Sequence, residues 1–162
     1  MTASAHALVG ASLAAKIVNP TIGLPLALVS HSLLDLIPHW DFGTNHQQKS
    51  KTRLFLEASF DVLLGVFLVW LLFRNLVSPV YLWSMVVAAQ LPDWIDTFSS
   101  LIGISDYKPF VWLKNFQRKY NNKLELPWGL ITQSVALAIA VWGLTPVSGG
   151  NFIALVFPIL NP

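Results

Sequence analysis

The chain has 162 residues, of which 54% are hydrophobic and only 11% are charged. Soluble domains carry about 25% charged residues, so the composition excludes an ordinary soluble domain and favours a small multi-pass membrane protein. The absence of cysteine excludes disulfides, thiolate metal ligands and a thiol nucleophile. The net charge is +2, and the basic residues are better explained by membrane topology than by a nucleic-acid partner.

The sequence predicts an all-α fold with five transmembrane helices in a single integral-membrane domain, 1–162. The helices are expected at 4–18, 21–37, 54–73, 80–102 and 128–147. The third is the clearest, because Arg53 and Arg74 bracket a 20-residue stretch, about the length that spans the bilayer core. Pro92 is expected to kink or break the fourth helix. The apolar segment 152–160 is too short to span and is predicted to be interfacial or re-entrant.

Small residues recur at helical spacing in the first segment. They form two adjacent faces, Ala7, Ala11 and Ala15 on one and His6, Gly10 and Ala14 on the other. Such faces let membrane helices approach one another closely. The stretches 36–42 and 90–98 also resemble each other, each with Pro-x-Trp and an acid near a helix end, which favours two related helical hairpins followed by a fifth helix.

Basic residues are distributed very unequally between the two predicted sides. The connections 42–53 and 103–127 hold eight Lys and Arg, and the opposite side holds only Lys16 and Arg74. The positive-inside rule therefore places both long loops and the N-terminus in the cytoplasm, for a protein of the inner (cytoplasmic) membrane. The basic and aromatic residues of 112–123 are equally consistent with ordinary positive-inside charge and with an amphipathic segment drawn to anionic lipid.

Nine ionisable side chains lie within or at the ends of these apolar segments, and the topology places all of them in the cytoplasmic leaflet. They are His6, His31, Asp35, His39, Asp41, Glu57, Asp61, Asp93 and Asp96. Helical spacing aligns His31 with Asp35, Glu57 with Asp61, and Asp93 with Asp96. Charge in hydrocarbon is costly, so such residues usually mark a pathway, a bound cation or a catalytic site.

Paired carboxylates on one helix face require protonation or a cation, and this layer contains no Lys or Arg. The sequence therefore predicts one or two divalent metal ions, Zn, Mn or Mg, held by nitrogen and oxygen ligands. The predicted ligands are His6, His31, Asp35, Asp61, Asp93 and Asp96. His39, Asp41 and Glu57 remain as predicted catalytic proton-transfer residues, although Glu57 is the weakest of these assignments, because it lies one turn from Arg53 and can instead form a surface ion pair.

Three short motifs carry a resemblance to a known family. Thr2-Ala3-x-x-His6, Ser30-His31-Ser32-Leu33-Leu34-Asp35 and Leu91-Pro92-Asp93-x-x-Asp96 resemble motifs of small inner-membrane proteins described as putative membrane-bound metal-dependent hydrolases. In that family the Leu-Pro-Asp motif usually precedes the Ser-His motif, and a further segment ending Thr-His-Ser is missing here. The resemblance implies a metal-dependent hydrolytic site that includes His6, His31, Asp35, Asp93 and Asp96.

The first functional hypothesis is a metal-dependent hydrolase that acts on a lipid phosphoester or another lipid headgroup ester. The second is a cation-coupled or proton-coupled transporter or channel, although the polar residues stop at mid-membrane. The third is a non-catalytic scaffold whose metal or acid cluster holds the helices together. Membrane lipid is the expected substrate or environment of the protein. Assembly into a homo-oligomer is compatible with the sequence.

Overall fold

The computed structural model describes residues 1–144, and the secondary-structure elements of this part of the chain are all helices, which confirms the predicted all-α class. The α-helices are α1 (Ala3–Lys16), α2 (Pro20–Asp35), α3 (Lys51–Phe73), α4 (Pro79–Leu101), α5 (Lys108–Tyr120) and α6 (Trp128–Leu144), with a short 3₁₀ helix at His46–Gln48. Five of them correspond to predicted segments. Helix α5 lies inside the connection 103–127, and the predicted segment 152–160 lies outside the described residues.

Local sequence signals fix most of the helix ends. Thr2 and Ser50 accept hydrogen bonds from backbone amides of the first turns of α1 and α3, and Asn19 caps α2 just before Pro20. Helix α4 continues through Pro92 to Leu101, so the predicted interruption does not end the helix. Proline removes one backbone donor, and the packing of α4 against α1, α2 and α5 stabilises the helix despite this loss.

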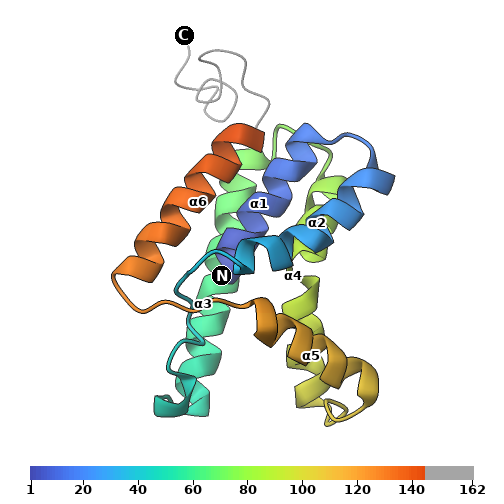
Figure 1. Ribbon diagram of the computed structural model, residues 1–162. Helices are drawn as coiled ribbons and strands as arrows, with labels where there is room; N and C mark the ends of the chain where they lie inside the picture. Colours follow the sequence, from blue (N-terminus) through green and yellow to red (C-terminus); the bar gives the residue numbers. More distant parts are fainter. Residues whose placement is uncertain (145–162) are drawn as a thin grey trace.

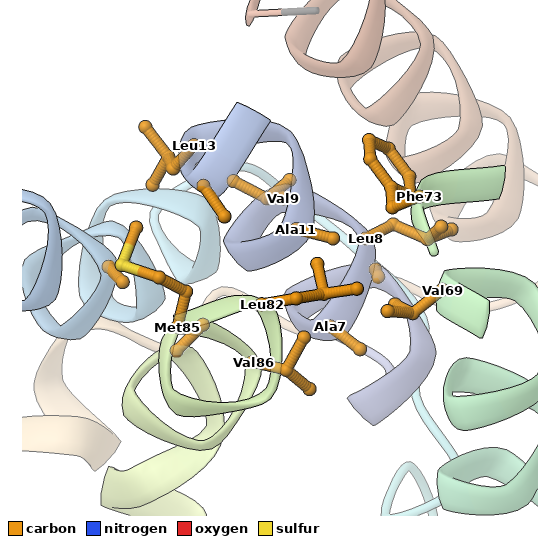
Figure 2. Packing of buried hydrophobic residues seen from close by; sticks show 14 of the residues in the cluster. Ala7, Leu8, Val9, Ala11, Leu13, Val69, Phe73, Leu82, Met85 and Val86 are labelled. Atoms are coloured by element: carbon orange, nitrogen blue, oxygen red, sulfur yellow. The ribbon is translucent and has the colours of Figure 1, made fainter. Parts of the chain in front are cut away.

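Helix α1 is the centre of the bundle and packs against α2, α3, α4 and α6 (Figure 1). Every residue from Ser4 to Ala14 is buried. In Figure 2, Val69 and Phe73 of α3 lie on one side of α1, and Leu82, Met85 and Val86 of α4 lie on another. A helix that is apolar all round is stable only when it is surrounded, so the position of α1 follows from its composition.

Glycines allow close approaches between α1 and two of its neighbours. A Cβ added to Gly10 would lie 2.8 Å from the Met85 carbonyl oxygen, and one added to Gly65 would lie 2.9 Å from the Ser4 Cα. Helices α4 and α3 therefore contact the α1 backbone almost directly. This is the close packing that the small-residue faces of the first segment predict.

Large apolar side chains cover much of the outer surface of the bundle. They include Leu63 at 67% exposure, Val80 at 82% and Trp142 at 85%. Helix α3 is long and apolar enough to cross a membrane, and only 17% of its apolar window is buried. It is the one helix in residues 1–144 that meets this criterion. Helices α1 and α2 have 14 and 16 residues, which gives them lengths of about 21 and 24 Å.

The connections predicted to be cytoplasmic lie at one end of the molecule. The segment before α3 and the whole of α5 occupy this end, and the turns between α1 and α2 and between α3 and α4 occupy the other (Figure 1). The segment after α2 is tied to the segment after α5, because the His39 amide donates to the Asn122 carbonyl at 3.0 Å and the Leu124 amide donates to the His39 carbonyl at 2.7 Å. This pairing places α5 against the ends of α2 and α4.

Candidate metal centre

Three helices bring His6, His31 and Asp93 together. Helices α1 and α2 form a hairpin, so the beginning of α1 lies beside the end of α2, and the His6 and His31 rings stack with centroids 4.0 Å apart. Asp93 approaches from α4, with its Oδ1 3.4 Å from His31 Nε2. One ligand atom from each of the three residues lies within 4.8 Å of the other two. Two imidazoles and a carboxylate at this spacing can hold a divalent metal ion.

The hydrogen bond of His31 fixes which of its nitrogens faces the cluster. His31 Nδ1 lies 2.9 Å from the Ala89 carbonyl oxygen. A carbonyl oxygen only accepts, so Nδ1 carries the proton and donates. In the neutral ring Nε2 then has a free lone pair, and this buried atom has no hydrogen-bond partner. Metal-binding histidines are typically oriented in this way, with the second nitrogen donating to a carbonyl or carboxylate.

Asp35 lies at the centre of the cluster. Its Oδ1 is 3.3 Å from His6 Nε2 and 3.7 Å from His39 Nε2, and its Oδ2 is 3.5 Å from His31 Nε2. The Met1 ammonium group also contacts Asp35 Oδ1. Within residues 1–144 no Lys or Arg side chain pairs with Asp35. The predicted pairing of His31 with Asp35 on one helix face is present, and the charged partner of Asp35 in this part of the chain is the Met1 ammonium group.

His39 and Asp41 extend the cluster beyond the end of α2. His39 Nδ1 donates to the Ile37 carbonyl at 2.8 Å, and its unpartnered Nε2 lies 3.9 Å from Asp41 Oδ2. The other Asp41 oxygen accepts a hydrogen bond from Lys123 Nζ at 3.0 Å. Burial, followed by the nearby Met1 ammonium group, lowers the pKa of His39 below its ordinary value of 6.5. His39 is therefore neutral at pH 7, with a free lone pair.

Asp61 and Glu57 have other partners. Both oxygens of Asp61 are engaged by the N-terminus of α1, with bonds of 2.6 Å from the Ala3 amide, 3.1 Å from the Ser4 amide and 2.6 Å from the Ser4 hydroxyl. Glu57 pairs with Lys49 at 2.7 Å and with Arg53 at 2.8 Å. Asp61 thus positions the helix that carries His6, and Glu57 forms the surface ion pair that its spacing from Arg53 also allowed.

Asp93 and Asp96 line an open cavity of about 590 Å³ on the same side of the molecule as α5. The cavity reaches Asp35 and Asp41, so it joins the metal cluster to the polar end of the bundle. Among the described residues, Asp96 makes no side-chain hydrogen bond or ion pair. It lines the cavity and lies outside the group formed by His6, His31 and Asp93.

Two glutamines support the site without having been predicted as part of it. Gln90 Nε2 donates to the Ala3 carbonyl at 3.2 Å, and Gln133 exchanges two hydrogen bonds with Thr2, at 3.3 and 3.2 Å. Both side chains are buried. They fix the first turn of α1, and with it His6, to α4 and α6. A lone amide within an apolar helix is the sequence signal that could have identified them.

The geometry defines an all-helical protein with a candidate His/Asp metal centre at one end of its bundle. The chain has no significant match to any protein-family model, curated protein or solved structure. The function is therefore inferred from the centre itself.

Proposed function

We propose that the protein is a metal-dependent hydrolase that is embedded in the membrane and cleaves a lipid phosphoester. The observation that supports this proposal best is the geometry of His31, whose protonated Nδ1 donates to Ala89 and whose free Nε2 faces two carboxylates. A lone pair directed at carboxylate oxygens is unfavourable unless a proton or a metal ion lies between them. His6 and Asp93 complete a ligand set for such an ion.

The outer surface supports a multi-pass membrane protein. Exposed Ile22, Leu26 and Val29 on α2, and Val135 and Ile139 on α6, accompany the apolar surface of α3. A soluble monomer rarely exposes so large an apolar area. With the basic loops in the cytoplasm, the metal centre lies in the cytoplasmic leaflet of the inner membrane, at the depth of lipid headgroups.

Zn, Mn or Mg at such a centre would polarise a phosphoryl oxygen and lower the pKa of a bound water to about 7. The residues of the chain supply the remaining functions. His6, His31 and Asp93 hold the ion, and Asp35 balances its charge from the centre of the cluster. His39 accepts a proton at its free Nε2 and faces Asp35 and Asp41, so it can act as the general base.

The proposal is tested with the full chain reconstituted in liposomes that contain phosphatidic acid and phosphatidylglycerol. We expect phosphate or headgroup release that stops after chelation, returns with Zn, Mn or Mg, and falls to background in His31→Ala and Asp93→Asn. Asp106→Asn, an exposed acid in the turn before α5, should retain full activity. Turnover that survives both chelation and the two variants would contradict the proposal. Stoichiometric metal with no turnover on either lipid would favour the scaffold.

A further inference from the structure

The cavity beside the metal centre has a basic and amide wall as well as an acidic one. Helix α5 contributes Lys114, Gln117 and Arg118 to its lining, and Asn121, which directly follows the helix, lines it as well. Spacings of three and four residues place Gln117 and Arg118 on the same face of α5 as Lys114. The same cavity is also lined by Asp35, Asp41, Asp93 and Asp96. Side chains of both charges thus line the cavity.

The groups on this wall have no partners of their own. Within residues 1–144, Lys114 and Arg118 form no side-chain hydrogen bond or ion pair, whereas Lys123 is engaged by Asp41 at 3.0 Å. Gln117 Nε2 and Asn121 Oδ1 are buried atoms without hydrogen-bond partners. A buried polar atom without a partner has lost its hydration without compensation, and a ligand in the cavity that hydrogen-bonds to it would remove that cost.

The other face of α5 carries a ridge of aromatic side chains. Trp112 stacks on Phe116 with centroids 5.6 Å apart, and Phe116 contacts Tyr120 at 4.9 Å. Trp112 is 68% exposed. Aromatic residues beside Lys and Arg on a surface helix are typical of the membrane interface. Helix α5 therefore separates the cavity from a surface that suits lipid.

We propose that the polar face of α5 binds the phosphate group of the substrate, with Lys114 and Arg118 neutralising its charge and Gln117 Nε2 donating a hydrogen bond. Two cationic donors and an amide suit the non-bridging oxygens of a phosphate ester. The ester phosphorus then lies between this wall and the metal centre. The inference rests on the proposed function and assigns its substrate-recognition residues. The ligand chemistry is a phosphate ester, which either a soluble molecule or a lipid headgroup can present.

Binding is measured with the metal-loaded full chain, using two probes. The first is glycerol 3-phosphate, titrated by calorimetry in detergent, and the second is phosphatidic acid in nanodiscs, followed by the retention of labelled lipid. We expect the double variant Lys114→Ala/Arg118→Ala to bind at least tenfold more weakly than the wild-type protein, with unchanged metal content. Lys119→Ala is the matched control, because Lys119 lies over the Tyr120 ring and does not line the cavity.

The two probes distinguish the sources of the phosphate group. Weakened binding of both supports a wall that accepts any phosphate ester, and weakened binding of phosphatidic acid alone supports recognition of the lipid headgroup. Wild-type binding of both probes by the double variant would overturn the inference. Metal content is measured in the same samples. A wild-type protein that does not retain its metal would count against the proposed hydrolase. A wild-type protein that retains its metal but binds both probes independently of Lys114 and Arg118 would count only against phosphate binding by α5.

Discussion

Replacing Asp61 with Ala should destabilise the protein without removing a metal ligand. Asp61 is 5% exposed as a residue, and its carboxylate accepts three hydrogen bonds from the first turn of α1. Hydrogen bonds to a charged acceptor contribute about 1.5–3 kcal/mol each, and a carboxylate at a helix N-terminus adds about 0.3–1 kcal/mol. The three bonds share one carboxylate and do not add fully, so we expect a loss of about 3–4 kcal/mol in unfolding free energy.

Equilibrium unfolding in mixed micelles, followed by far-ultraviolet circular dichroism, measures this loss. Asp61→Asn keeps one carbonyl acceptor and should lose less stability than Asp61→Ala. Glu57→Ala is the control on the same helix, because its ion pairs with Lys49 and Arg53 lie at the surface, where such pairs contribute little. The folded fraction of Asp61→Ala should keep its metal. Loss of metal at unchanged stability would refute the capping role and make Asp61 the ligand that the sequence predicts.

Two further predictions concern packing and topology. Gly10→Val should lower the unfolding free energy by about 1–3 kcal/mol and reduce metal occupancy, because the new side chain meets the Met85 carbonyl and shifts α1 with His6. Gly143→Val is the control and should do neither, because nothing lies within 4 Å of a Cβ added there. Equal stability of the two variants in the same unfolding assay would contradict the packing of α1 against α4. Because the chain has no cysteine, the single variants Gln48→Cys and Asn75→Cys each carry one thiol that reports the side of the membrane on which it lies. A membrane-impermeant maleimide should label Asn75→Cys in intact cells but Gln48→Cys only after permeabilisation. The reverse pattern would contradict the cytoplasmic location of the basic loops.

The helical fold could be predicted because apolar segments and their caps are local properties of the sequence. The burial of α1 follows from its small residues, and Gly10 lies where α1 contacts the backbone of α4 at Met85. Helix α5 was not predicted as a separate helix, because its charged residues resemble an ordinary basic loop. The pairing of His39 with Asn122 and Leu124 places α5 against α2 and α4. Only this tertiary contact determines which face of the amphipathic helix borders the cavity.

Part of the candidate site could also be predicted from the sequence. His31 and Asp35 share a helix face by their spacing alone, and their contact at 3.5 Å follows from it. The same spacing in Glu57 and Asp61 does not bring both residues to the cluster, because Lys49 and Arg53 pair with Glu57 and the N-terminus of α1 engages Asp61. Which helix end meets Asp61 depends on the contact of α1 with Gly65, a tertiary feature that no local pattern contains.

The central claim is that His6, His31 and Asp93 bind a divalent metal ion, and elemental analysis of the purified full chain tests it most directly. The protein should be compared with His31→Ala and Asp93→Asn, and with Asp106→Asn as the exposed control. We predict at least one equivalent of Zn, Mn or Mg in the wild-type protein and in the control, and loss of that equivalent in both cluster variants, with circular dichroism showing an intact fold. Folded wild-type protein that contains no metal and takes up none of the three ions when they are added would contradict the claim.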